Sequence, residues 1–289
     1  MTQVKKSQLS RLANQAFELS FNIPWEAIDK TYQAELAKAA ENATLKGFRK
    51  GKAPVELVEK QVNQPALYQN ALKSLLPKYY TEAIKEHDLK PVANPKIDTL
   101  KSEAKEDWQF KATSCELPQV QVDGFETIVK EAATPEQLWT PGSGGEKLDE
   151  KKAQSQKLGL IFKALLEKIK LDLPEILIEQ ESGRLLSRLL AQINRLGLVL
   201  DQYLASINKT AEQLQADYKK QAEDSLRLEL ILQTIGQAKN ITVAQEEVDK
   251  VIQAAPDEKT RQAFQTPLQQ AYLNANLRKQ KVIDYLLAL

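Results

Sequence analysis

The chain has 289 residues, 42% of them hydrophobic and 27% charged, and its 40 basic and 39 acidic side chains give a formal net charge of +1 at pH 7. This composition is typical of folded globular proteins and excludes a collagen, a disordered chain and a membrane-embedded chain, while the length favours two domains. Because the N-terminus is polar and no run approaches the roughly 18 apolar residues of a membrane span, we expect a cytoplasmic protein with no secretory signal and no membrane partner.

The first part of the chain, residues 1–113, is predicted to be an α+β domain. Apolar and polar residues alternate from Phe17 to Ile23, a period of two that indicates a strand with one buried face. Pro24 then opens a helix from Trp25 to Asn42, in which apolar residues recur at spacings of three and four.

Two more helices are expected to begin at Pro54 and Pro65, and Pro77 is expected to kink or divide the second of them. Strand-like runs follow from Ile97 to Leu100 and from Trp108 to Thr113. This order of elements indicates helices packed on a small antiparallel sheet.

Residues 114–147 are predicted to be an extended linker, in which Asp123-Gly124 can turn and the run from Phe125 to Lys130 is expected to be strand-like. The segment Pro141-Gly142-Ser143-Gly144-Gly145 would interrupt any regular element. It lacks the strand–turn–helix context and the GK[ST] ending of a phosphate-binding loop, so we expect no nucleotide site and no cofactor.

The remainder, residues 148–289, is predicted to be an all-α domain of long helices. Gly197 and Gly236 lie where helices could stop or loosen. Four residues are expected to begin helices, either as prolines in a first turn or as threonines of an N-cap: Pro174, Thr210, Thr242 and Thr266.

Catalytic and metal-binding side chains are scarce. The chain has one histidine, His87, and one cysteine, Cys115, so neither an intrachain disulfide nor a zinc site with two histidines can form. We interpret His87 as a solvated histidine near a helix end and Cys115 as a half-buried strand residue. No catalytic residue and no metal site is therefore predicted.

One loop, Lys46 to Pro54, combines four cations with an aromatic residue and two glycines. The glycines allow a tight turn, so Phe48, Arg49 and Lys50 should project from its tip. Cations of this kind bind phosphate, and an aromatic side chain can stack on a base or fill a pocket. The alternative is a solvated basic turn with Phe48 folded inward.

The run Gly47-Phe48-Arg49-Lys50-Gly51-Lys52-Ala53-Pro54 resembles the ribosome-docking loop of bacterial trigger factors, chaperones that meet nascent chains at the ribosomal tunnel exit. The order of the surrounding strands and helices and the helical second half also match that family. The resemblance implies an ATP-independent ribosome-associated chaperone whose helical domain shields unfolded polypeptides. It also implies roles for seven loop residues: contact with exit-site protein and rRNA for Phe48, Arg49 and Lys50, shaping of the tip for Gly47, Gly51 and Pro54, and added charge for Lys52. The residues that contact clients have no compact motif.

The sequence departs from the family in one respect. Trigger factors usually carry an FKBP-like prolyl isomerase domain between the linker and the helical body, and this chain has no room for one. We therefore expect a non-enzyme that lacks the domain, either naturally or through an engineered join at residues 142–145. The resemblance leaves open a homodimer of the free protein.

Three other functions remain as alternatives. A periplasmic holding chaperone of the SurA type has a similar helical core, although the polar N-terminus and the loop speak against it. An RNA-binding ribosome-associated factor would keep the loop without chaperone activity. An isomerase is disfavoured by the missing domain. The small excess of Lys and Arg over Asp and Glu in residues 1–113 suits contact through one loop better than a broad basic face.

Overall fold

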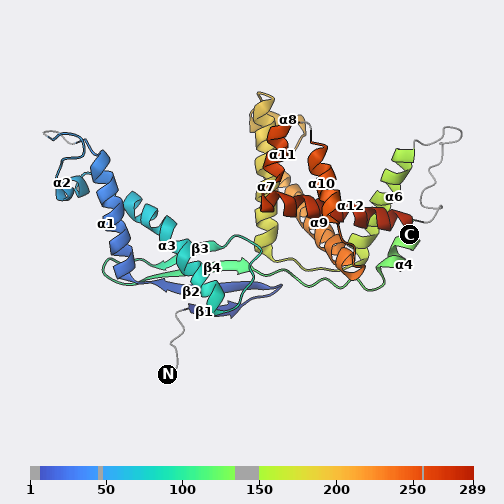
Figure 1. Cartoon of the computed structure of the whole chain (residues 1–289), viewed down its shortest axis with the longest axis horizontal. Coiled ribbons are helices and arrows are strands. Elements are labelled where there is room, and N and C mark those ends of the chain that lie inside the picture. The colour runs from blue at the N-terminus through green and yellow to red at the C-terminus, as the bar shows by residue number, and fades with distance from the viewer. Residues whose placement is uncertain (1–6, 45–47, 134–149, 256) are drawn as a thin grey trace, which may run out of the picture. The chain divides into compact units, whose positions relative to one another are not determined.

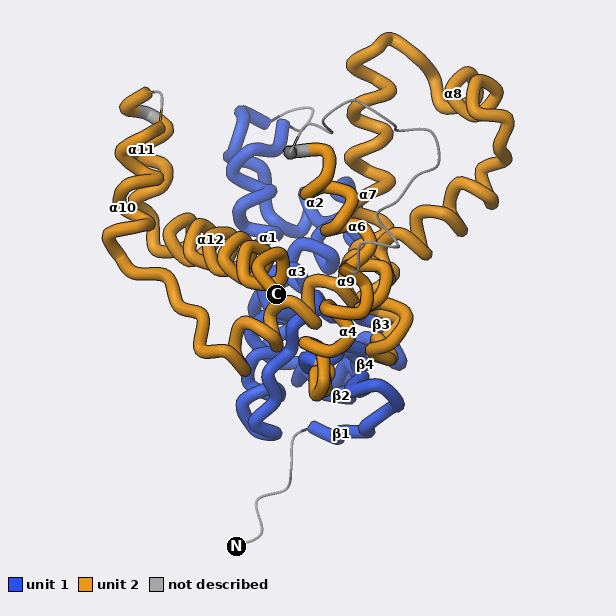
Figure 2. The backbone as a smooth tube through the Cα atoms, turned by 90° about the vertical axis from the view of Figure 1, so that its right-hand side faces the viewer, with its two compact units in different colours: residues 1–117 blue, residues 118–289 orange. Residues whose placement is uncertain are grey.

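The computed structural model describes residues 7–44, 48–133, 150–255 and 257–289 (Figure 1). The chain divides into two compact units, Met1–Leu117 and Pro118–Leu289 (Figure 2). Each unit has its own buried apolar cluster. Among the described helices, none is both long and apolar enough to cross a membrane.

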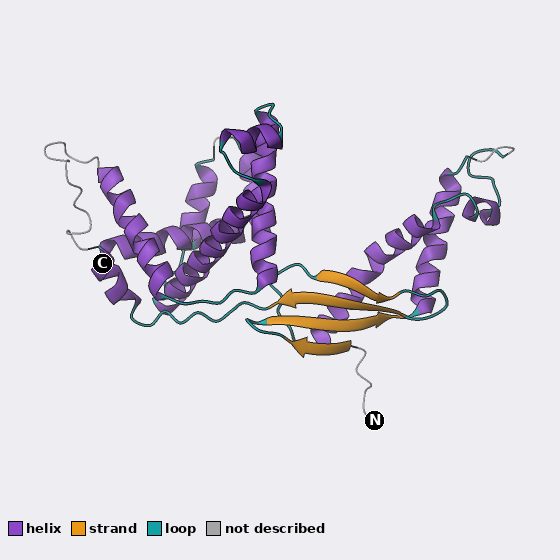
Figure 3. Ribbon diagram, turned by 180° about the vertical axis from the view of Figure 1, so that it is seen from behind, coloured by secondary structure: helices purple, strands orange, loops and turns teal. Residues whose placement is uncertain are grey.

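The first unit contains a four-stranded antiparallel sheet (Figure 3). In β2, alternate apolar side chains such as Phe17 and Leu19 are fully buried, which is what the period of two predicts. The register pairs Phe21 with Phe110 and Ile23 with Trp108. The strands lie in the order β1-β2-β4-β3 and have these bounds: β1 Ser7–Arg11, β2 Ala16–Ile23, β3 Lys96–Lys101 and β4 Trp108–Cys115.

The sequence does not predict the edge strand β1. Its residues are mostly polar and exposed, so they show little apolar alternation. The strand forms because its backbone pairs with β2, from Ser7 opposite Phe21 to Arg11 opposite Phe17. This pairing satisfies hydrogen-bonding groups without requiring an apolar face.

Three helices, α1 (Trp25–Asn42), α2 (Val55–Glu59) and α3 (Gln64–Glu86), complete the first unit. Both α1 and α3 contribute to the core above the sheet. Of the two outcomes expected at Pro77, a kink or a division, the division does not occur, because α3 continues through Pro77. Leu75 and Ala83 are buried on either side of Pro77, so packing holds both halves in one helix even though proline removes a backbone hydrogen bond.

The second unit is entirely helical in its described part. Buried residues of α4, α6, α9 and α12 form its main core, which includes Val129, Ile161, Ile235 and Leu286. The helices are α4 (Phe125–Ala132), α6 (Glu150–Lys168), α7 (Glu175–Arg195), α8 (Leu200–Ser206), α9 (Ala211–Ala238), α10 (Gln245–Gln253), α11 (Glu258–Phe264) and α12 (Pro267–Ala288). An α+β unit followed by an all-α unit with long helices confirms the predicted fold class.

The expectation of an extended segment up to Lys130 is wrong, because α4 forms there. Phe125, Val129 and Ala132 are buried at spacings of four and three, which is the period of one helix face. The eight residues of α4 taken alone cannot reveal this face, since its partners lie on α6, α9 and α12. The later part of the predicted linker, residues 134–147 with the glycine-rich run, lies outside the described residues.

Three of the four predicted helix starts in the second unit are confirmed. Pro174 precedes α7, and the side chains of Thr210 and Thr266 accept hydrogen bonds from the first turns of α9 and α12. The start at Thr242 is wrong, because α10 begins after Ala244. There the Glu247 carboxylate accepts from the Ala244 N–H at 2.9 Å, so the residue three positions after Ala244 satisfies the N–H of the observed N-cap.

Candidate functional site

In the loop between α1 and α2, residues 43–44 and 48–54 are described, and Gly47 lies outside the described residues. Helix α1 ends where Ala43 turns to an extended conformation, and α2 begins after Pro54. Ala53 is buried against Ala40 of α1 and Val58 of α2. This small apolar contact ties the end of the loop to the two helices that flank it.

Gly51 closes the loop. Its N–H donates to the carbonyl of Ala43 at 3.1 Å, and the Lys52 N–H donates to the Arg49 carbonyl at 2.9 Å. The backbone of Gly51 is left-handed, with φ at +73°, and a Cβ there would stand 2.7 Å from the carbonyl oxygen of Glu41. Only glycine tolerates both the positive φ and the close approach of the Glu41 carbonyl, so the conformation of the loop at this point requires Gly51.

The tip of the loop carries exposed side chains of two kinds. Phe48 is 42% exposed, an unusual position for a phenylalanine, and it does not fold into the core. Arg49, Lys50 and Lys52 are exposed, and none of them forms an ion pair with another described residue. The loop therefore presents an aromatic ring beside cations that have no internal partner.

The base of the loop is held by aromatic and polar contacts between three helices. The rings of Tyr32 on α1 and Tyr68 on α3 stack with centroids 4.4 Å apart. The Tyr32 hydroxyl donates to Glu59 at the end of α2, at 3.1 Å. Burial, together with this hydrogen bond, raises the pKa of Tyr32 to about 12, so the hydroxyl keeps its proton and remains a donor at neutral pH.

Two exposed apolar residues beside the loop are absent from the predicted site. Val55 and Leu57 on α2 are exposed, whereas Val58 of the same helix is buried. The helical period provides a signal for this, since a helix that buries Val58 must direct part of its remaining apolar surface to solvent. The candidate site is therefore the segment from Phe48 to Leu57, with apolar and cationic side chains together.

The first prediction concerns the Gly51 backbone. We expect Gly51→Ala to lower the free energy of unfolding of the first unit by about 2 kcal/mol, because it combines left-handed strain with an overlap on backbone. Gly197→Ala is the matched control: its φ is +72°, but nothing lies within 4 Å of the added Cβ, so strain alone should lower stability by about 1 kcal/mol. Denaturant unfolding followed by tryptophan fluorescence and far-UV circular dichroism measures both. Equal losses would show that the overlap with Glu41 is relieved without cost.

The structure gives no catalytic arrangement around the lone histidine. Ser7 lies 3.0 Å from Nε2 of His87, but the Ser7 hydroxyl donates to the Glu86 carboxylate at 2.5 Å. The single hydroxyl proton of Ser7 is thus directed away from the imidazole. In an activated serine the hydroxyl instead donates its hydrogen bond to the histidine, which then acts as a base. His87 is half-buried by this contact and is not the solvated residue that the sequence suggests.

Cys115 is fully buried at the end of β4, more than the half-buried position expected. Burial raises the pKa of its thiol to about 11, so the reactive thiolate is scarce at neutral pH. No group of three or more His, Cys, Asp or Glu side chains that could hold a metal ion occurs in the described part of the chain.

Comparisons with known proteins cover nearly the whole chain. Residues 5–137 match the family model described as bacterial trigger factor protein, and residues 145–288 match the model of the bacterial trigger factor C-terminus. Trigger factors from Staphylococcus aureus strains JH9 and Newman are each 36% identical over 110 residues, which are 38% of this chain and 25% of those proteins. This chain thus matches a quarter of the length of these relatives.

The fold is also similar to that of a solved structure. It is described as "Promiscuous Substrate Recognition in Folding and Assembly Activities of the Trigger Factor Chaperone". The match covers 97% of this chain and 99% of that chain, with a TM-score of 0.55 and 12% sequence identity. At this identity the similarity concerns the fold alone.

Proposed function

The chain belongs to the bacterial trigger factor family, and from this premise we propose that it is an ATP-independent cytoplasmic chaperone that docks on the ribosome near the nascent-chain exit. In this proposal the first unit binds the ribosome and the helical unit shields emerging polypeptides. Phe48, Arg49 and Lys50 are assigned to the contact, Gly47, Gly51 and Pro54 to its shape, and Lys52 to its charge.

The observation that carries the proposal is the exposed tip of the loop. Phe48 is exposed beside cations without an internal partner, on a base fixed by Tyr32, Tyr68 and Glu59. A rigid base lowers the entropy lost on docking, and free cations can meet rRNA phosphates without first breaking an ion pair. Protein and RNA surfaces at the exit site suit this mixture of aromatic and cationic groups.

Exposed apolar side chains of the helical unit support the shielding role. Leu196 is 75% exposed at the end of α7, and Leu268 is 78% exposed in the first turn of α12. Further exposed apolar residues of this unit are Leu190, Leu198, Val199, Val251 and Tyr272. Such side chains can make weak contacts with many unfolded sequences, and a client leaves when it buries its own apolar surface.

Docking and shielding are linked by proximity. A chaperone held at the exit site meets the emerging chain at a high effective concentration, so weak contacts suffice. Binding to unfolded and not to folded clients delays collapse by mass action, without a nucleotide.

Two measurements test the proposal. Co-sedimentation with ribosomes should be salt-sensitive, and the same chain should suppress aggregation of a chemically unfolded client protein. Holding activity without ribosome binding would favour the SurA-type alternative. Ribosome binding without holding activity would favour an RNA-binding factor, and the absence of both would reject the proposal.

A second prediction concerns isomerase activity. Only residues 138–144 lie between the two family matches, which leaves no internal space for a domain of the FKBP type. We expect this chain to catalyse no prolyl isomerisation above background in a peptide or refolding assay. A free FKBP-type domain is the positive control, and turnover comparable to that control would contradict the prediction.

A further inference from the structure

Helix α2, which follows the loop, is attached to the rest of the first unit by few side chains. It has five residues, of which only Val58 is buried, against Ala40 of α1 and Ala53 of the loop. Among the described residues, the one side-chain hydrogen bond to this helix runs from the Tyr32 hydroxyl to Glu59, at 3.1 Å. A helix of five residues is not stable by itself, so these contacts decide where α2 and the loop before it lie.

Tyr32 has a fixed place in the core of the first unit. Its side chain is buried with Leu36 and Leu67. Its ring stacks on that of Tyr68, with an angle of 22° between the ring planes, and the ring of Tyr68 lies 5.4 Å from that of Trp108 on β4. Rings packed in this way have few alternative rotamers, so the core determines the position at which the Tyr32 hydroxyl meets α2.

Glu59 is not where helix stability alone would place a carboxylate. It is the last residue of α2, and a negative charge at the C-terminal end of a helix is repelled by the unpaired carbonyls there. Its hydrogen-bond partner among the described residues is the Tyr32 hydroxyl. Because the pKa of Tyr32 is raised to about 12, the hydroxyl keeps its proton and the bond persists at neutral pH.

We propose that Tyr32 is a positioning residue for ribosome docking, which through Glu59 fixes α2 and the loop tip at Phe48 in the orientation that binds. The inference rests on the proposed function and adds to it a buried residue that does not itself touch the ribosome. A molecule whose loop is misoriented does not bind, so the apparent affinity follows the fraction of correctly oriented loops. The exposed side chains of Val55 and Leu57 move with α2 and are positioned by the same bond.

A positioning residue and a contact residue differ in their effect on salt dependence. The slope of affinity against salt follows the number of phosphates that the protein neutralises. Replacing Arg49 and Lys50 would therefore reduce this slope. Loss of the Tyr32 hydroxyl leaves both cations in place, so the affinity should fall while the slope stays the same.

The test measures the ribosome affinity of the whole chain by co-sedimentation at several salt concentrations. Tyr32→Phe keeps the stacked ring and removes only the hydroxyl. We expect it to weaken binding about threefold, within the roughly fivefold that one hydrogen bond contributes, with an unchanged salt slope. Tyr285→Phe is the matched control, because it removes a hydrogen bond of the same kind, from a tyrosine hydroxyl to Glu126 at 2.9 Å, in the second unit. This control should bind ribosomes as the native chain does.

Variants of Glu59 separate positioning from a direct contact of its carboxylate. Glu59→Gln keeps an acceptor for the Tyr32 hydroxyl and should bind nearly as the native chain does, whereas Glu59→Ala should match Tyr32→Phe. Since both substitutions break the same bond, the double variant should bind no more weakly than Tyr32→Phe alone. Additive losses would show that Glu59 acts on the ribosome independently of Tyr32, which contradicts the inference.

Hydrogen exchange locates the effect without the ribosome. The N–H groups of Leu57 and Val58 donate to the Pro54 carbonyl at 3.0 and 3.2 Å. Loss of the Tyr32 hydroxyl should make these two amides exchange about fivefold faster, because the hydrogen bond no longer opposes opening of α2. Amides of β4, which lies in the sheet, should exchange as in the native chain.

Three further results would overturn the inference: native affinity in folded Tyr32→Phe, a reduced salt slope in this variant, or unchanged exchange at Leu57 and Val58. If the native chain binds ribosomes while any of these occurs, Tyr32 has no positioning role and the proposed function stands. If the native chain does not bind ribosomes, the proposed function fails and the role of Tyr32 in docking fails with it. Should Tyr32→Phe not fold, Glu59→Ala decides the question, because Glu59 is only half-buried and lies outside the aromatic core.

Discussion

Replacing Phe48, Arg49 and Lys50 together by alanine is expected to weaken ribosome binding about a hundredfold while the fold persists. All three side chains are exposed, so their removal leaves no cavity in the core. Truncating an exposed aromatic anchor and two phosphate-binding cations removes the groups that carry interface energy. Co-sedimentation with ribosomes measures the loss, and circular dichroism verifies the fold.

A matched variant separates the loop from general charge. Lys96, Leu100 and Lys105 are also exposed in the first unit, and their replacement by alanine removes the same charge and a similar apolar side chain. This variant should bind ribosomes within about twofold of the native chain, since exposed charges away from a contact have a small, screened effect. Equal loss in both variants would show that binding follows net charge and not the loop.

The salt dependence of ribosome affinity is an independent measurement of the same contact. Two phosphates engaged by Arg49 and Lys50 predict roughly a tenfold loss of affinity between about 50 and about 200 mM salt, as the counterions released on binding become more abundant. The alanine variant should lose most of this dependence and keep only the part that comes from the charge of Lys52. A slope that is unchanged in the variant would place the phosphate contacts elsewhere.

Local signals in the sequence predict the first unit well. Alternation from Phe17 to Ile23 predicts one strand, and a proline just before or within the first turn predicts three helix starts. Each of these signals depends on neighbours within a few residues. The strand β1 carries no such signal. It exists through backbone pairing with β2, and pairing is a long-range property.

The candidate site shows the same division between local and long-range information. Glycines that flank a cationic run predict an exposed tip, and Phe48 is exposed as the loop chemistry suggests. The support of the loop by Tyr32, Tyr68 and Glu59 involves three helices, and no spacing in the sequence connects them.

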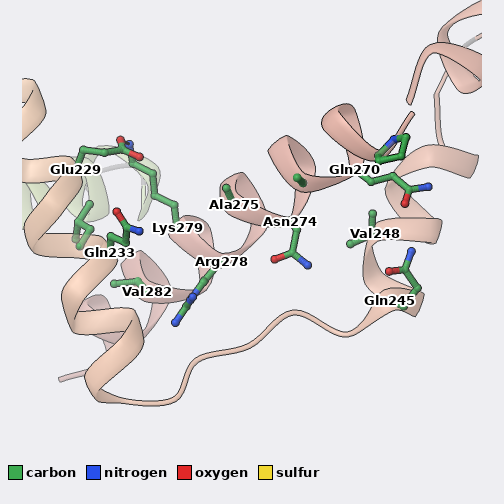
Figure 4. A pocket seen from close by; sticks show the side chains of 13 residues that line it. Glu229, Gln233, Gln245, Val248, Gln270, Asn274, Ala275, Arg278, Lys279 and Val282 are labelled. Carbon is green, nitrogen blue, oxygen red and sulfur yellow. Dashed lines mark hydrogen bonds and ion pairs between the residues drawn. The ribbon is translucent and has the colours of Figure 1, made fainter. Parts of the chain in front are cut away.

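Gly236 has a role that its sequence position alone does not show. It lies in the last turn of α9, which ends at Ala238, so the expectation that the helix stops near it agrees with the structure. Gly236 is also buried, because a second helix approaches closely: a Cβ at this position would be 2.9 Å from Cγ2 of Val282 on α12 and 3.4 Å from Nε of Arg278 (Figure 4). Glycine lets the two helices approach closely. This packing role depends on a long-range contact, which local sequence signals do not reveal.

The close contact between Gly236 and α12 leads to the last prediction. We expect Gly236→Val to lower the free energy of unfolding of the helical unit by about 3 kcal/mol, because added methyl groups must displace a buried, stiff valine at a helix crossing. Gly183→Val is the control: Gly183 lies in α7 with nothing within 4 Å of an added Cβ, so stability should change by less than about 0.5 kcal/mol, with a slight gain from helix propensity. Thermal and denaturant unfolding followed by circular dichroism measure both variants. If Gly236→Val is as stable as Gly183→Val, α12 can move away from α9 without cost, and the close approach at Gly236 does not stabilise the helical unit.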